Sequence, residues 1–117
     1  MLNQMLKAKI HRASVTMCNL NYEGSISIDE NLIIAAGLNE YEKVLVVDLN
    51  NGARFETYII KAEKGSCEIG LNGAAARLVE IDDKIIIIAF ALYNEEELKS
   101  HKPKIIFVDE KNNIINK

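Results

Sequence analysis

Apolar and polar residues alternate along residues 6–16, which is the first regular pattern in the chain. Ala8 and Ile10 fall on one face of an extended segment, and the residue between them is a lysine. A period of two predicts a β-strand with one buried face. The alternation changes phase at Ala13, so we expect a bulge near Arg12.

Five later apolar runs are also typical of strands, and they cover residues 44–49, 53–60, 67–71, 84–93 and 104–109. The first two flank Asn50-Asn51-Gly52, in which Asn-Gly is a strong hairpin signal. Lys64-Gly65-Ser66 predicts a second turn. The run at 84–93 is so continuously apolar that we expect it to be buried on both faces. A polar tail follows the last of these runs, residues 104–109.

Two short helices are expected between the strands. Ser27-Ile28-Asp29-Glu30 fits a capping box, which begins a helix by satisfying its first backbone N–H groups. That helix then covers residues 32–36, and Gly37 can end it. Asn94, with a glutamate at the third helical position, begins a second helix that closes before Pro103.

These elements predict a mainly β protein with short helices. Of its 117 residues, 49% are hydrophobic and 26% are charged, which is typical of a folded globular chain. The chain is long enough for one core, and no linker or low-complexity stretch divides it. We therefore expect a single domain over residues 1–117.

Charge and hydropathy exclude several classes of partner. A formal net charge of -3 gives no electrostatic reason to expect nucleic acid. The longest apolar run, residues 85–92, is far shorter than the roughly 20 residues that span a bilayer, and the N-terminus lacks a signal-peptide core. We expect a cytoplasmic protein without a membrane partner. Cys18 and Cys67 lack the spacing of a metal site, so we expect free thiols and no metal.

The Gly24-Ser25 bond is the feature with the most specific chemistry. A serine hydroxyl beside a glycyl carbonyl can attack it and move the acyl group from nitrogen to oxygen. Elimination of that ester leaves dehydroalanine, which hydrolyses to a pyruvoyl group. Gly24 suits this reaction because it tolerates strained backbone and obstructs the attack little. Gly-Ser is also a common turn pair, so its meaning depends on its surroundings.

Three further motifs surround this bond in the sequence. They are Lys9-Ile10-His11-Arg12-Ala13, Asn51-Gly52-Ala53-Arg54-Phe55 with Thr57-Tyr58, and Asn72-Gly73-Ala74-Ala75-Ala76. In order and spacing the chain resembles the pyruvoyl-dependent aspartate 1-decarboxylase family. The likeness extends from about residue 5 to about residue 109, and four separated motifs in register are far more specific than any one of them.

The resemblance implies a fold and a reaction. The fold is a double-psi β-barrel. The chain cuts itself between Gly24 and Ser25 into residues 1–24 and 25–117, and Ser25 becomes a covalent pyruvoyl cofactor. The substrate is L-aspartate, and the products are β-alanine, used for pantothenate and coenzyme A synthesis, and carbon dioxide. The resemblance also implies a homotetramer, and the sequence leaves open whether cleavage needs a maturation factor.

Cationic and hydroxyl side chains supply the implied substrate contacts. Lys9 and Arg54 suit the two carboxylates of aspartate, as a point charge and a planar two-point grip. The resemblance makes Tyr58 the proton donor after decarboxylation and assigns Thr57 to the cleavage intermediate and the substrate. Tyr58 shares the strand face of Arg54, whereas Thr57 points the other way, so either a local bend or a second surface is needed.

The small residues of the last motif have two interpretations. They can form an ordinary turn into a short helix, or their backbone amides can approach a ligand closely. The resemblance implies that Asn72 assists at the reacting centre and that Gly73, Ala74 and Ala75 line the substrate pocket. His11 shares the strand face of Lys9, but its role and that of Tyr22 stay open.

Two alternatives to this function remain at the level of sequence. One is a small β-barrel that binds or regulates and never matures. The other is a pyruvoyl-dependent decarboxylase that acts on a different amino acid.

Overall fold

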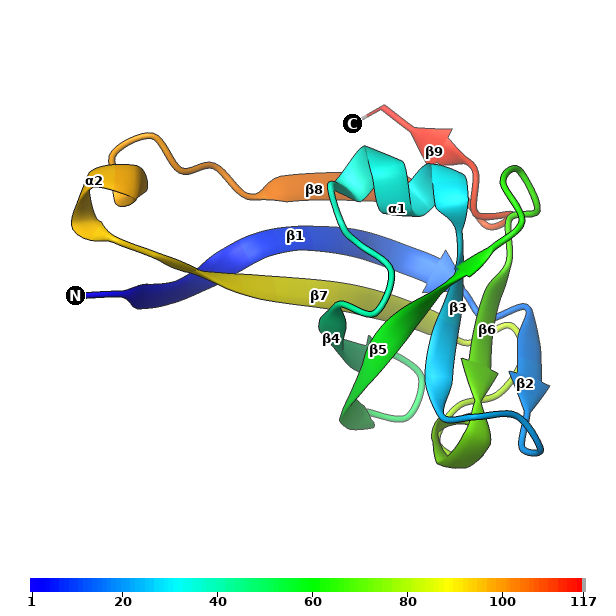
Figure 1. Ribbon diagram of the computed structural model, residues 1–117. Helices are drawn as coiled ribbons and strands as arrows, with labels where there is room; N and C mark the ends of the chain where they lie inside the picture. Colours follow the sequence, from blue (N-terminus) through cyan, green and yellow to red (C-terminus); the bar gives the residue numbers. More distant parts are fainter. Residues whose placement is uncertain (117) are drawn as a thin grey trace.

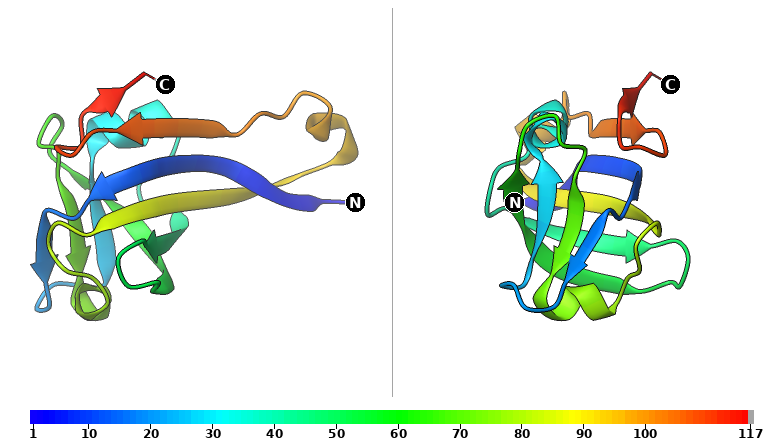
Figure 2. Two further views of the ribbon diagram at one scale, coloured as in Figure 1. Left: turned by 180° about the vertical axis from the view of Figure 1, so that it is seen from behind. Right: turned by 90° about the vertical axis from the view of Figure 1, so that its right-hand side faces the viewer.

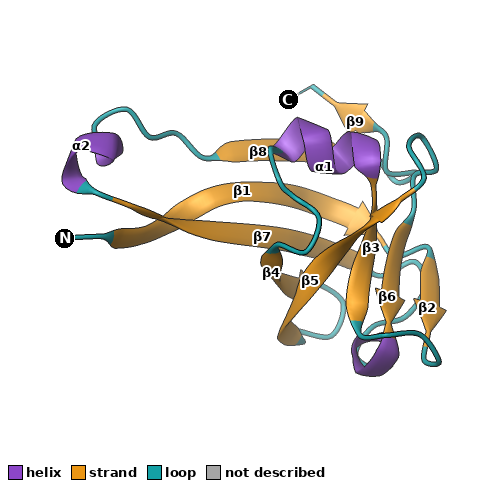
Figure 3. Cartoon of the chain, in the orientation of Figure 1, coloured by secondary structure: helices purple, strands orange, loops and turns teal. Residues whose placement is uncertain are grey.

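The computed structural model of the protein describes residues 1–116, and strands make up most of its regular structure (Figures 1 and 3). In chain order the strands are β1 (Asn3–Ser14), β2 (Met17–Asn19), β3 (Ser25–Asp29), β4 (Lys43–Asp48), β5 (Arg54–Ala62), β6 (Ile69–Asn72), β7 (Lys84–Tyr93), β8 (Lys104–Val108) and β9 (Ile114–Ile115). The helices are α1 (Glu30–Ala36), the 3₁₀ helix η1 (Gly73–Arg77) and α2 (Glu95–Leu98). The predicted mainly β class with short helices is confirmed.

The strands form one mixed sheet that curls into a small barrel, consistent with the double-psi class. Its strand order is β2-β6-β3-β5-β4-β7-β1-β8-β9. β1 and β2 stand near opposite ends of this order, although only Val15 and Thr16 separate them in the chain. The sheet must therefore bend round on itself, and the Thr16 N–H donates to the Ile69 carbonyl at 2.8 Å where the two ends meet. Figure 2 shows the curled sheet from two further sides.

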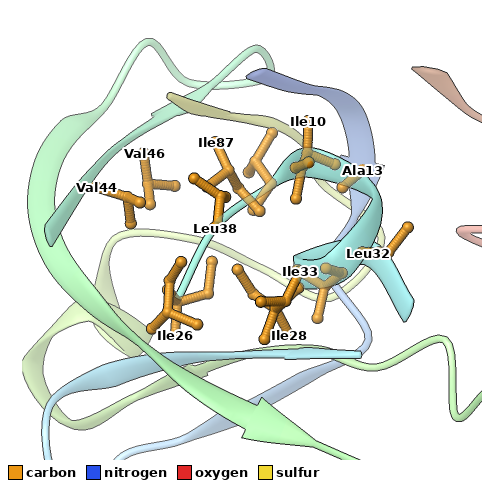
Figure 4. Close-up of a cluster of buried hydrophobic side chains, with 14 of the residues drawn as sticks. Ile10, Ala13, Ile26, Ile28, Leu32, Ile33, Leu38, Val44, Val46 and Ile87 are labelled. Carbon is orange, nitrogen blue, oxygen red and sulfur yellow. The ribbon is translucent and has the colours of Figure 1, made fainter. Parts of the chain in front are cut away.

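Branched aliphatic side chains from most of the strands fill the barrel. Figure 4 shows those from β1, β3, β4 and β7 pointing toward one another. Leu32 and Ile33 of α1 join this cluster, so the helix closes one end of the core. The bulge expected in β1 is confirmed, since the register with β7 shifts between Ile10 and Ala13 and Arg12 has a φ of 64°.

The start of α1 differs from the prediction. Ser27 does not cap the helix, because it lies within β3. The N-cap is Asp29, whose carboxylate accepts the Asn31 N–H at 2.8 Å. The same carboxylate accepts the N–H groups of Gly65 and Cys67, at 3.0 and 2.8 Å. Burial opposes ionisation of Asp29, but these three donors outweigh it and lower the pKa of the carboxyl.

Strand β7 has the predicted bounds, but the expectation that both of its faces are buried is wrong. Ile85 and Ile87 are completely buried, whereas Phe90 is 43% and Leu92 is 61% exposed. The reason is visible in Figure 1: β1 and β7 continue past the barrel as a two-stranded ribbon, which we call the arm. At its end Asn94 begins α2 with the expected capping box.

The predicted polar tail carries structure that the sequence did not reveal. β9 pairs antiparallel with β8. Just before it, Asn112 is buried and has a positive φ of 64°. Its side chain accepts the Ser14 N–H at 2.7 Å and donates to the carbonyls of Ser14 and Cys67 at 2.9 and 3.0 Å. The tail therefore fastens the end of β1 to the turn before β6.

Candidate functional site

Ser25 is the first residue of β3, and the sheet brings two other predicted site residues next to it. On one side Ser25 pairs with Asn72, the last residue of β6. On the other side β3 runs parallel to β5, and the residue after Ser25, Ile26, pairs with Ile59. Tyr58, the residue before Ile59, is therefore at the level of Ser25 in the sheet. Ser25 is completely buried. Residues far apart in the sequence thus meet around one serine.

Hydrogen bonds fix the Ser25 hydroxyl from two sides. The hydroxyl donates to the Glu23 carbonyl at 3.0 Å. Asn72 Nδ2 donates to Ser25 Oγ and also to Ser27 Oγ, each at 3.0 Å. Asn72 is only 3% exposed, so water competes little for these bonds. Ser27 was missed as a site residue, because its position two residues after Ser25 matters only once β3 is known to be a strand.

Gly73 lies directly against the residue that precedes Ser25. A Cβ on Gly73 would come within 2.8 Å of both Cα and N of Gly24, and within 3.0 Å of the Tyr22 carbonyl oxygen. Gly73 also has a φ of 66°, where side chains are disfavoured. A glycine is therefore required here by both space and backbone conformation. Its contact is with the backbone of the predicted cleavage loop.

Replacing Gly73 with Ala should destabilise the protein more than an ordinary glycine substitution. Gly37 is a matched control, because it has a φ of 68° but a Cβ at this position would have no atom within 4 Å. We expect Gly37→Ala to lower the free energy of unfolding by about 1 kcal/mol through backbone strain. Gly73→Ala adds a backbone clash and should cost roughly 3 kcal/mol. Urea unfolding measures both, and equal losses would contradict the close contact.

Thr57 and Tyr58 lie in the middle of β5. They have opposite parity on the strand, yet both line one shallow hollow of about 280 Å³ together with Lys43 and Glu56. Tyr58 pairs with Lys43 of β4, and the next residue, Ile59, pairs with Ile26 of β3, so β5 changes its partner strand at this point. The two hydroxyls can thus serve one site despite their alternation.

Lys9 lies on a different part of the sheet from β5, the strand that carries Arg54 and Tyr58. Lys9 pairs with Ile88 of β7, Ile88 with Leu45 of β4, and Leu45 with Glu56 of β5. Measured along the curled sheet, three strand spacings of about 4.8 Å, or roughly 14 Å, therefore lie between Lys9 and β5. The side chains between them are apolar and partly exposed. We call this surface, made by Leu45, Ile86 and Ile88, the outer apolar face.

The remaining predicted residues lie in the first turn of η1, in the loop before Ser25 and in β1. Ala74 is exposed, and Ala75 is half-buried against the core. Tyr22 is exposed in the loop before Ser25. His11 lies in a separate hollow of about 310 Å³ beside the β1 bulge, where its ring meets the edge of Phe107 at 5.6 Å between centroids.

A buried carboxyl supports the hairpin that carries Arg54. Asp48 is 2% exposed, and its Oδ1 accepts the N–H groups of Asn50 and Asn51 at 2.7 and 3.3 Å. Its Oδ2 receives no hydrogen bond from a donor among the described residues, and the Asp83 carboxyl lies beside it. Burial raises the pKa of Asp48, and the neighbouring Asp83 raises it further. Nothing in the sequence marks these two aspartates as neighbours.

Replacing Asp48 with Asn should stabilise the protein at neutral pH. Because the folded-state pKa is raised, the folded chain holds a proton that the unfolded chain has lost, so stability falls as pH rises from about 4 toward the folded pKa. Asparagine keeps the acceptor for the hairpin N–H groups and can donate to Asp83. We expect a gain of about 1–2 kcal/mol at pH 7 and a flatter pH profile in urea unfolding.

The control for this substitution is Asp82→Asn, which removes an exposed carboxyl from the same turn as Asp83. It changes net charge equally without removing a buried carboxyl, so it separates the effect of charge from the effect of Asp48. An Asp48→Asn variant that is less stable than the parent at pH 7 would show that the carboxylate is favourable in the fold.

Within residues 1–116, no three His, Cys, Asp or Glu side chains gather closely enough to hold a metal ion. Cys18 and Cys67 are both free thiols, and burial raises the pKa of Cys18, with Asp83 and Glu80 adding to the effect. None of the described helices combines the length and apolar character needed to cross a membrane.

Three proteins with similar sequences carry the same name. The family model described as aspartate decarboxylase matches residues 1–115. A protein of Caldicellulosiruptor saccharolyticus named aspartate 1-decarboxylase is 63% identical over 115 residues, which cover 98% of this chain and 90% of the relative. Proteins of the same name from Acetivibrio thermocellus and Wolinella succinogenes are 62% and 60% identical, covering 96% and 95% of this chain and 89% and 92% of their own lengths. With its buried serine after a glycine and a family match over nearly every residue, the chain belongs to the aspartate decarboxylase family.

Proposed function

We propose that this chain cuts itself between Gly24 and Ser25 and then decarboxylates L-aspartate to β-alanine and carbon dioxide, for pantothenate and coenzyme A synthesis. The observation that carries the proposal is the buried Ser25 hydroxyl, held by Asn72 and the Glu23 carbonyl next to a tightly packed glycine. Family membership over residues 1–115 supports an enzyme of this kind. The alternative of a barrel that never matures has no support from the relatives, which are named as enzymes.

The cleavage needs no reactant other than water. Ser25 Oγ bonds to the carbonyl carbon of Gly24, the C–N bond breaks, and the hydroxyl proton moves to the nitrogen, which leaves an ester and a free amine. Loss of the Cα proton and of the C–Oγ bond then releases the Gly24 carboxylate and leaves dehydroalanine. Water replaces its nitrogen, ammonia leaves, and residue 25 becomes a pyruvoyl group at the head of residues 25–117.

The residues around Ser25 suit such a group. Asn72 on β6 and the hydroxyls of Thr57 and Tyr58 on β5 offer hydrogen-bonding partners on the two strands that flank β3, and Gly73 packs against the backbone just before Ser25. The pyruvoyl ketone supplies an electron sink for loss of carbon dioxide from an amino acid. Tyr58 then has the task of delivering a proton to the substrate carbon.

Aspartate brings two carboxylates, and we assign them to the cationic side chains of Lys9 and Arg54. Ala74 and Ala75 in the first turn of η1, next to Gly73, leave the substrate close to backbone amides. Within one chain three strand spacings, or roughly 14 Å along the sheet, lie between Lys9 and β5, across the outer apolar face. We therefore infer that a site with both cations is assembled from more than one copy of the chain.

The assembly that we propose is a homotetramer. The outer apolar face and the exposed Phe90 and Leu92 on the arm provide apolar surface for contacts between copies. Light scattering of the mature protein measures the assembly directly. A monomer with full activity would refute both the tetramer and the shared site.

Intact mass and a product assay test the function together. We expect two fragments, residues 1–24 and residues 25–117 with a pyruvoyl end, and release of β-alanine from aspartate. Glutamate and cysteine, assayed in parallel, separate this activity from that of a decarboxylase for another amino acid. A chain that stays whole after prolonged incubation and releases nothing from aspartate would support the non-enzymatic alternative.

Two further points of the proposal concern the setting of the reaction. Precursor that cuts itself in buffer needs no maturation factor, whereas precursor that stays whole until cell extract is added requires one. We also propose a cytoplasmic location, in keeping with the two free thiols. Cell fractionation with an antibody against the chain tests the location.

A further inference from the structure

The Asn72 side chain uses one amide group for two hydroxyls on the same strand. Nδ2 lies 3.0 Å from Ser25 Oγ and 3.0 Å from Ser27 Oγ. Ser25 and Ser27 are two residues apart on β3, so both hydroxyls point to one face of the sheet. An amide group has two hydrogens, and each of these can serve one hydroxyl. All three residues are buried.

We propose that Ser27 is a positioning residue for self-cleavage: its hydroxyl holds the Asn72 carboxamide in the orientation that presents an N–H to Ser25. This inference rests on the proposed function, because it concerns the geometry of the serine that is expected to attack Gly24. Ser27 does not contact the reacting bond itself in this assignment. It acts through Asn72.

The direction of the hydrogen bonds explains why orientation matters. The Ser25 hydroxyl donates its hydrogen to the Glu23 carbonyl, so Oγ faces Asn72 as an acceptor. If the carboxamide turned over, its oxygen would face Oγ and two acceptors would oppose each other. The second N–H, bonded to Ser27 Oγ, gives the productive orientation a second hydrogen bond and fixes the place of the carboxamide. The bond to Glu23 fixes the hydrogen of the Ser25 hydroxyl, and the bond from Asn72 fixes one lone pair of Oγ. The other lone pair of Oγ then has a defined direction for attack.

The sheet leaves this side of Ser27 open to Asn72. In the pairing of β3 with β6, Ser25 stands opposite Asn72, and Ser27 stands opposite Gly70. Gly70 has no side chain that could compete for the Ser27 hydroxyl. The Asn72 amide can therefore reach both the serine directly opposite and the serine on the diagonal.

Cleavage removes one of the two anchors. Oγ of residue 25 leaves as part of the Gly24 carboxylate when the ester is eliminated, so Asn72 loses its bond to that atom. Ser27 is unchanged by the reaction. Its hydroxyl is then the one of the two that still holds the carboxamide beside residue 25.

The test compares cleavage rates in freshly made precursor. The parent chain, Ser27→Ala and Ser27→Thr are made by cell-free synthesis, and the fraction of whole chain is followed by intact mass. We expect Ser27→Ala to cut about tenfold more slowly, and Ser27→Thr, which keeps a hydroxyl, to cut within about twofold of the parent rate.

A double-mutant cycle separates positioning from a general structural effect. In an Asn72→Ala background the proposed target of Ser27 is gone, so adding Ser27→Ala should slow cleavage no further. The same tenfold slowing in both backgrounds would overturn the proposal, as would a parent rate for Ser27→Ala alone. A parent chain that never cuts would instead overturn the proposed function, so the two failures are distinguishable.

Discussion

Ser25→Ala is expected to remain a single chain of 117 residues and to release no product from aspartate. The substitution removes the only atom that we assign to attack on the Gly24 carbonyl. It also removes two hydrogen bonds, one from Asn72 and one to the Glu23 carbonyl, which together cost about 2 kcal/mol and leave the fold intact. Intact mass after prolonged incubation measures the outcome, together with a β-alanine assay.

Ser66→Ala provides the control for this experiment. Ser66 is exposed in the turn before β6, where its hydroxyl accepts the Glu68 N–H at 3.3 Å. Ser66→Ala loses a serine hydroxyl far from Ser25 in the sequence, so this variant should cut like the parent. Two fragments from Ser25→Ala would rule out the hydroxyl as nucleophile and with it the origin of the pyruvoyl group.

Tyr58→Phe should mature normally but turn over aspartate about 100-fold more slowly, the usual scale for losing a positioned acid. Phenylalanine keeps the packing of the half-buried ring in the middle of β5 and deletes only the hydroxyl. A hydrazine reagent counts the ketone groups independently of activity, so turnover is expressed per mature site. Maturation at the parent level with slow turnover is the expected combination.

Tyr41→Phe is the matched control, because Tyr41 is 71% exposed in the loop before β4. Its turnover should equal that of the parent. If mature Tyr58→Phe also works at nearly the parent rate, Tyr58 is a packing residue, and water becomes the first candidate for the proton donor.

The sequence predicted long, regular strands well and short, interrupted ones poorly. The bulge at Arg12 follows from the change of alternation along residues 6–16, and the bounds of β7 follow from a continuous apolar run. β3 escaped notice because only five residues form it and two of them are serines, which suggested a helix cap. Burial of β7 was overestimated because composition does not tell that a strand leaves the barrel and continues into an arm.

The site followed a similar rule. Motif residues such as Ser25 and Asn72 were named from the sequence, and the structure places them in direct contact. Ser27 and Asp48 were missed because their roles depend on contacts with Asn72 and Asp83, which lie far away in the sequence. Such contacts become visible only when the fold is known. The separation of Lys9 from β5 was equally hidden, since it depends on the two strands that lie between them.

The place of β1 in the sheet has a thermodynamic consequence for the cut protein. β1 lies between β7 and β8, and its Ala8, Ile10 and Ala13 are completely buried. Cleavage after Gly24 would put this strand on a short, separate peptide that the larger fragment cannot do without. Unfolding of the cut form then becomes a dissociation governed by mass action, with a midpoint that rises with protein concentration. The uncut chain refolds as one molecule, whereas the cut pair has to find each other again.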